Sequence, residues 1–128
     1  MTKTPIPTRV LGIGALLAAL GLQPVLADDF PADAKTPSAA EISALFAGKT
    51  WIMIPARGGE LQLEHAADGG FRAFVGGKSD SGTWRAEDGK MCYEFKGPFT
   101  SACNDVRLVG EQVLFKRSSG EVAPVKPK

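Results

Sequence analysis

Few side chains in this 128-residue chain could carry out catalysis or hold a metal ion. His65 is the only histidine, and Glu64 and Asp68 are the carboxylates nearest to it in the sequence. Together they could supply metal ligands, or His65 could serve a Ser-His-Asp triad, but nothing resembles the nucleophile elbow of a hydrolase. A lone histidine at a strand end is more often a surface residue. We therefore expect a protein that is not an enzyme, with no catalytic residue, no cofactor and no metal site.

The two cysteines, Cys92 and Cys103, are the other candidates for chemistry. Their spacing is not that of a Cys-x-x-Cys redox or metal motif. Gly97-Pro98 lies midway between them and predicts a turn that would place the cysteines opposite each other on neighbouring strands. Directly opposed Cβ atoms lie about 4.5–5.5 Å apart, close to what a disulfide requires. We predict a Cys92–Cys103 disulfide, worth about 3 kcal/mol for so short a loop.

A hairpin positions the first of these cysteines. Asp88-Gly89 is a strong type I′ turn dipeptide, because both central residues of that turn need positive φ. A two-residue loop there pairs Arg85 with Cys92 and alternates the flanking side chains between two faces. One face is polar, and the other carries the apolar side chains Trp84, Ala86, Met91 and Tyr93. The register set by the turn places the polar side chains on one face and the apolar side chains on the other, and this agreement predicts the hairpin.

One helix and a series of short strands make up the rest of the pattern. Ser38 and Glu41 match a capping box, and a helix of about ten residues with one apolar stripe should run from there to Gly48. Period-two segments then follow at residues 49–54, 60–65, 71–75, 82–96, 99–103, 106–109 and 112–117. Residues 76–80 should form a loop, and Asn104-Asp105 is a position for a bulge or turn. The short connections leave no room for crossover helices, so the sheet should be antiparallel.

These elements predict a mainly β protein, a small antiparallel up-and-down β-barrel of the lipocalin or avidin-like meander type, with one short N-terminal helix covering one end. A β-sandwich or a highly curved open sheet is the alternative. We expect residues 1–27 to be a cleavable signal peptide, 28–37 a flexible leader, 38–117 the barrel domain with its helix, and 118–128 a disordered tail. The signal is predicted from basic Lys3 and Arg9, an apolar run over 10–22 and small residues before the cleavage site.

Export and charge limit the possible partners. A disulfide in an exported chain indicates the periplasm or the outside of the cell. Without Lys3 and Arg9 the remaining chain has one more acidic than basic side chain. Such a balance gives no large positive field, so we expect no nucleic-acid partner. We also expect no stable membrane insertion after signal cleavage, because the apolar run is too short to span a bilayer comfortably.

Aromatic and loop-borne residues are the candidates for contacts with a ligand or partner. Most aromatic residues should fill the core, but some could line a barrel mouth that holds a small apolar or sugar-like ligand. Phe74 falls on the opposite face from its apolar neighbours, so we expect it to be exposed. Arg57 and Lys78 lie in expected loops, where binding modules commonly place their contacts. The candidate contacts are Trp51, Trp84, Tyr93, Phe74, Arg57 and Lys78.

Several of these segments together resemble a known family. Leu45 to Trp51, Gly82-Thr83-Trp84, Asp88 to Tyr93 and Cys103 resemble the Gly-Thr-Trp…Asp-Gly-x-x-Cys…Cys core of small exported proteobacterial proteins of unknown function. That resemblance implies a periplasmic location and a β-rich fold, and it supplies no activity. A weaker likeness is to avidin-like barrels of secreted bacterial metalloprotease inhibitors, which also open with a short helix followed by Ala-Gly and a tryptophan, although their disulfide lies elsewhere.

The sequence thus favours a periplasmic or secreted binding or accessory module whose partner is a small ligand or an envelope protein. The alternative is an inhibitor of a secreted or envelope hydrolase, such as a protease or lysozyme. An inhibitor would need a protruding segment, and residues 55–59 or 76–80 are the candidates. A barrel filled by aromatic side chains would leave no pocket and would move the function to the loops.

Overall fold

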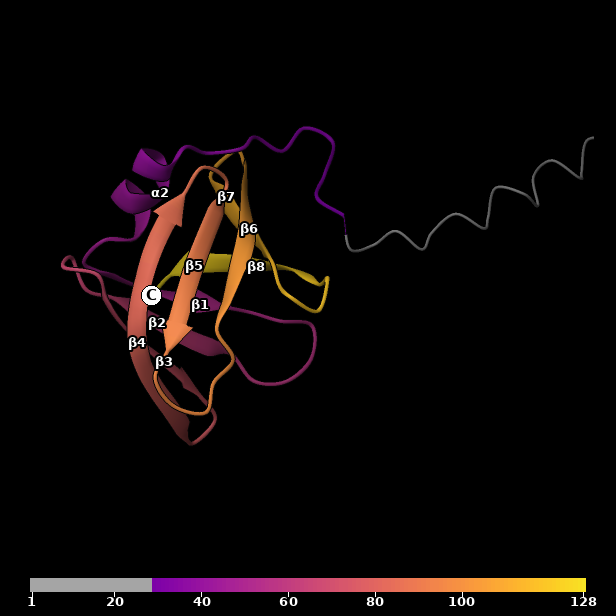
Figure 1. Cartoon of the computed structure of the whole chain (residues 1–128). Helices are drawn as coiled ribbons and strands as arrows, with labels where there is room; N and C mark the ends of the chain where they lie inside the picture. Colours follow the sequence, from indigo (N-terminus) through magenta and orange to yellow (C-terminus); the bar gives the residue numbers. More distant parts are fainter. Residues whose placement is uncertain (1–28) are drawn as a thin grey trace, which may run out of the picture.

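The structure is a computed structural model that describes residues 29–128. The predicted signal peptide, residues 1–27, lies outside the described residues. Within the described residues, one helix and eight strands follow one another, and the strands form a closed antiparallel barrel in sequence order, with β1 pairing with β8. The elements are α2 (Ala39–Phe46), β1 (Lys49–Met53), β2 (Leu61–His65), β3 (Gly70–Val75), β4 (Lys78–Glu87), β5 (Lys90–Phe95), β6 (Ala102–Val109), β7 (Gln112–Lys116) and β8 (Val122–Pro127). The prediction of an up-and-down barrel is confirmed (Figure 1).

Helix α2 forms where the capping pattern predicts it. The Ser38 side chain accepts a hydrogen bond from the Glu41 backbone N–H, and the Glu41 carboxylate accepts one from the Ser38 N–H. Gly48 follows the helix with a φ of 75°, which glycine adopts without strain. Ile42 and Phe46 are fully buried and seat the helix over one end of the barrel (Figure 1).

The central hairpin has the expected register. Trp84 pairs with Tyr93 and Arg85 with Cys92, and the next pairing along the sheet is Cys92 with Cys103. The two cysteines form the predicted disulfide, with their Cα atoms 3.9 Å apart. The position of Gly97-Pro98 midway between the two cysteines was therefore sufficient to place this bond.

Two terminal segments differ from the sequence predictions. The expected tail, residues 118–128, contains β8, which pairs with both β7 and β1 and closes the barrel. Pro124 and Pro127, which suggested disorder, are accommodated at the last strand of the sheet, where Val125 is buried. The described part of the expected flexible leader also contacts the barrel, since Lys35 bridges Leu108 through two backbone hydrogen bonds.

Two internal segments also differ. The expected loop over residues 76–80 is only a two-residue turn, because Lys78 already pairs with Val75 and starts β4. Gly76, at a φ of 61°, supplies the positive φ that so tight a turn needs. The expected bulge or turn at Asn104-Asp105 is wrong as well: both residues lie inside β6, paired with Met91 and Lys90.

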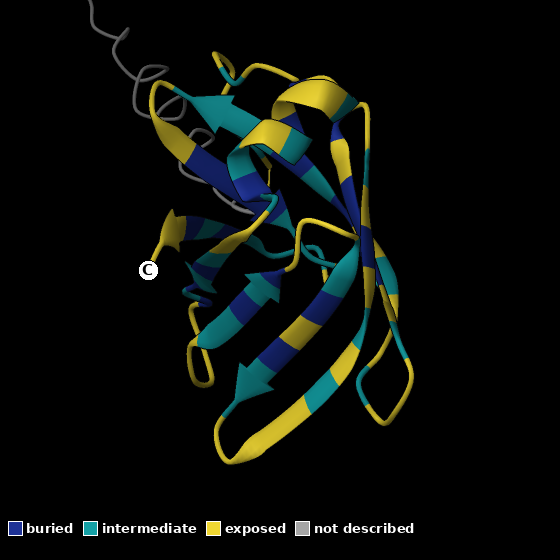
Figure 2. Ribbon diagram, turned by 90° about the vertical axis from the view of Figure 1, so that its left-hand side faces the viewer, coloured by how far each residue is buried: buried dark blue, intermediate teal, exposed yellow. Residues whose placement is uncertain are grey.

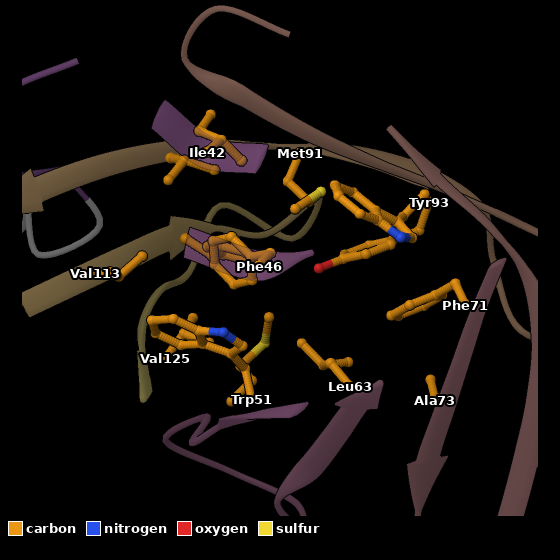
Figure 3. Close-up of a cluster of buried hydrophobic side chains, with 14 of the residues drawn as sticks. Ile42, Phe46, Trp51, Leu63, Phe71, Ala73, Met91, Tyr93, Val113 and Val125 are labelled. Carbon is orange, nitrogen blue, oxygen red and sulfur yellow. The ribbon is translucent and has the colours of Figure 1, made fainter. Parts of the chain in front are cut away.

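Buried and exposed residues alternate along the strands, which Figure 2 shows as bands of colour. The inward side chains form one core with Phe46 among them (Figure 3). Phe46 lies 4.4 Å from Trp51 and 5.8 Å from Phe115 between ring centroids, and Phe71 stacks on Tyr93 at 4.1 Å. The helix end of the barrel is therefore densely filled by aromatic side chains. No helix within residues 29–128 is long and apolar enough to cross a membrane.

Candidate functional site

The end of the barrel away from α2 is not filled. A cavity of about 500 Å³ opens there, within the range of small-molecule sites. We call it the open-end cavity. It is lined by Met53, Leu61, Leu63, Ala73, Val75, Tyr93, Phe95, Pro98, Phe99, Thr100, Ala102, Asn104, Arg117 and Ser118.

The strand topology explains why these residues meet. β1, β3, β5 and β7 run toward this end, and β2, β4, β6 and β8 run away from it. The lining therefore comes from the last residues of β1, β3 and β5 and from the first residues of β2 and β6. Ala73 and Ala102 are small inward-facing residues, so they leave space that larger side chains occupy at the helix end.

Asn104 is the exceptional residue of this lining. Its neighbours on the inner face of β6, Ala102 and Val106, are apolar, whereas Asn104 carries an amide and is only 8% exposed. Among residues 29–128, none of the hydrogen bonds found involves the side chain of Asn104. The Asn104 side chain therefore faces the open-end cavity with no hydrogen-bond partner among these residues.

The loop between β5 and β6 borders the open-end cavity and is held by one carboxylate. Asp80, on β4, accepts hydrogen bonds from the backbone N–H of Gly97 at 3.1 Å and of Phe99 at 2.9 Å. It also accepts one from the N–H of Ser81. Phe99 then packs edge-on against Phe95, with ring centroids 5.4 Å apart. The aromatic side of the mouth is thus fixed in place before any ligand binds.

A second carboxylate joins two other loops at this end. Glu121 accepts a hydrogen bond from the Ala56 N–H at 2.6 Å and forms an ion pair with Arg117 at 3.1 Å. The Ala56 N–H, Arg117 and the nearby charge of Arg57 lower the pKa of Glu121. The loop after β1 is therefore tied to the loop after β7, and the charge of Arg117 has its partner within the protein.

His65 and Tyr93 form a buried pair between the cavity and the helix end. His65 Nδ1 lies 3.1 Å from the Lys49 carbonyl oxygen, and Nε2 lies 2.9 Å from the Tyr93 hydroxyl. A carbonyl oxygen only accepts, so Nδ1 must carry the proton, and the Tyr93 hydroxyl donates to Nε2. Burial lowers the pKa of His65 to about 4 and raises the pKa of Tyr93 well above its usual range. Both groups are thus neutral and satisfied.

This placement corrects the prediction that His65 is a surface residue. It is 2% exposed, and its ring lies among those of Phe46, Phe71 and Trp84. Period-two alternation did place His65 on the same face as Leu61 and Leu63. The polarity of histidine argued for the surface, but the Tyr93 hydroxyl and the Lys49 carbonyl satisfy both ring nitrogens inside the barrel.

The predicted contact residues are distributed over several parts of the molecule. Tyr93 alone among them lines the open-end cavity. Trp51 and Trp84 are buried in the core, and their indole N–H groups donate to the carbonyls of Leu45 and Ala66. Phe74 is half-buried on the outer face, where the guanidinium of Arg72 lies 6.0 Å from its ring centroid, and Arg57 and Lys78 are exposed.

A second depression, of about 670 Å³, lies along β1 to β4 near the helix end. Although it is larger, it is more open, and many of its lining side chains are polar or charged, such as Glu64, Arg72 and Lys96. The open-end cavity has the more buried and apolar lining that small-molecule sites usually show, so it is the better candidate.

Neither a metal site nor a comparison with known proteins indicates a function for this protein. Within residues 29–128, no three His, Cys, Asp or Glu side chains come together in a way that could hold a metal ion. No protein-family model matches the chain, and neither a curated protein nor a solved structure matches it significantly. The cavity itself is therefore the guide to function.

Proposed function

We propose that this protein is a non-enzymatic binding module that holds a small, mainly apolar molecule in the open-end cavity. The observation that carries the proposal is a preformed apolar cavity of about 500 Å³ at the one barrel end that the helix leaves open. Eight-stranded barrels are just wide enough to be filled by side chains or to hold one small ligand. This barrel is filled at one end and hollow at the other.

The proposed location is the periplasm or the outside of the cell. The Cys92–Cys103 disulfide supports an oxidising compartment. The signal pattern of residues 1–27 and the resemblance to small exported proteobacterial proteins favour the same location. A binding module there would meet either a diffusible small molecule or an envelope component.

A fluorescent probe tests the proposal directly. N-phenyl-1-naphthylamine is neutral and apolar, and its emission rises in an apolar site; we expect saturable binding with one probe per barrel. Ala102→Leu, and separately Ala73→Leu, should block this binding, because the added methyl groups project into the cavity. Ala40→Leu makes the same change on the exposed face of α2 and should leave binding intact.

Native mass spectrometry of protein purified from its own host is the complementary test. An extra mass that survives native spray and disappears on unfolding would be the natural occupant. Probe binding that is not saturable, or that is equal in the wild type and both blocked variants, would contradict the proposal.

The second candidate function is inhibition of a secreted or envelope hydrolase. One observation favours it: residues 56–60 are exposed, yet Glu121 holds their loop through Ala56. A fixed, exposed loop lowers the entropy lost on binding, as in many inhibitors. Assays against proteases and lysozyme would test it, with Arg57→Ala expected to weaken inhibition and Lys90→Ala, exposed at the opposite end of the barrel, as the control.

A further inference from the structure

The open-end cavity combines an apolar lining with one buried amide, and that combination indicates what kind of ligand fits. Asn104 faces the interior from β6, and the pairing of β6 with β5 fixes its backbone. The amide offers two N–H donors and a carbonyl acceptor to whatever occupies the cavity. The Tyr93 hydroxyl already donates to His65, and the other hydroxyls of the lining, those of Thr100 and Ser118, lie at exposed positions.

Charge inside the cavity is absent or already paired. Arg117 is the only charged residue of the lining, and it forms an ion pair with Glu121 at 3.1 Å. An ionised group that entered with the ligand would lose its hydration and find no unpaired counter-charge in the lining. A neutral polar group would lose much less hydration and could recover it through one or two hydrogen bonds.

We propose that Asn104 is the specificity-determining residue of the open-end cavity and selects ligands that carry an uncharged hydrogen-bonding group, such as a ketone, alcohol or amide, on an apolar body. This inference rests on the proposed binding function and adds the chemical class of the ligand. The polar group enters first and meets Asn104, while the apolar body contacts residues such as Leu61, Val75 and Phe99.

The cavity should select against ligands that cannot form a hydrogen bond with Asn104. A hydrocarbon of the same shape would fill the cavity but leave the Asn104 amide without water and without a partner. A ketone accepts from that amide instead. One neutral hydrogen bond changes affinity by about three- to tenfold, which is the range expected between the two ligands.

The test uses three matched probes titrated into the full-length mature protein by isothermal calorimetry or NMR: 2-acetylnaphthalene, 2-isopropylnaphthalene and 2-naphthoate. We expect the wild type to bind the ketone about three- to tenfold more tightly than the hydrocarbon, and the naphthoate most weakly. Asn104→Leu should bring the ketone-to-hydrocarbon ratio close to one. Thr83→Val, a polar-to-apolar change at an exposed position of β4 outside the cavity lining, should preserve the ratio.

The outcomes separate the two proposals. If no probe binds the wild type, the binding function itself is refuted. If ketone and hydrocarbon bind equally well to the wild type, or if Asn104→Leu keeps the preference, the cavity binds ligands but Asn104 does not select them. Should the variant not fold, the side-chain amide resonances of Asn104 in the wild type decide: the ketone must shift them more than the hydrocarbon does.

Discussion

Acidification should destabilise this protein through the buried His65. Burial lowers the pKa of the folded-state histidine to about 4, whereas the unfolded chain keeps its ordinary value of 6.5. Between these two values the unfolded state binds the proton more readily, so stability falls as pH falls. The effect is absent above about pH 7 and complete below about pH 4.

The magnitude follows from the width of that window. The lowering of the His65 pKa from 6.5 to about 4 corresponds to a total loss of about 3.4 kcal/mol in stability, of which about 2 kcal/mol is already lost at pH 5. The structural cause is specific: His65 has aromatic rings around it, a carbonyl that can accept from Nδ1, and a hydroxyl that already donates to Nε2. If Nε2 were also protonated, its hydrogen would meet the hydroxyl hydrogen of Tyr93, so Tyr93 would have to reorient.

The assay is urea denaturation of the wild type and of His65→Gln at a series of pH values from about 8 to about 4. The variant keeps a neutral polar side chain but has no group that titrates here. We expect the wild type to lose about 2 kcal/mol more than the variant between pH 8 and pH 5. Other groups titrate in both proteins and cancel in the difference. Parallel pH profiles for the two proteins would refute the assignment of the buried neutral histidine.

Two further changes should each lower the free energy of unfolding markedly. Gly82→Ala should lower the free energy of unfolding by about 3 kcal/mol or more, because a Cβ there would collide with the backbone of β5. Gly59 has open space around it, so Gly59→Ala should stay within about 0.5 kcal/mol of the wild type. Thermal melts of the two variants test this difference. Replacing both Cys92 and Cys103 by alanine should lower the free energy of unfolding by about 3 kcal/mol, and equal urea midpoints before and after would contradict this.

Local patterns in the sequence were sufficient for most of the fold. The Asp88-Gly89 turn set the register of β4 and β5, and the position of Gly97-Pro98 then placed Cys92 opposite Cys103. The capping box at Ser38 located α2. Each of these features depends on residues close together in the chain, so sequence reasoning reaches them.

The errors came where distant segments decide the structure. Val122–Pro127 forms β8 because β1 and β7 both present free edges, and two prolines in a short stretch gave no hint of that pairing. The burial of His65 depends on Tyr93, which is far away in the sequence. Asn104-Asp105 predicts a bulge or turn because both residue types are common in turns, and nothing local shows that Asn104 faces a cavity.

The hollow end of the barrel is more than incomplete packing. A barrel whose interior merely lacked large side chains could let Phe95 and Phe99 collapse inward, which would bury apolar surface and remove the opening. Instead, Asp80 holds the loop that carries Phe99 through two backbone N–H groups, and Glu121 holds the loop across the mouth. Both anchors, together with the inward amide of Asn104, would be unnecessary in a filled barrel. Asp80→Ala should therefore increase hydrogen exchange at residues 97–99 and weaken probe binding while the barrel stays folded; unchanged exchange there would mean that the mouth does not depend on this anchor.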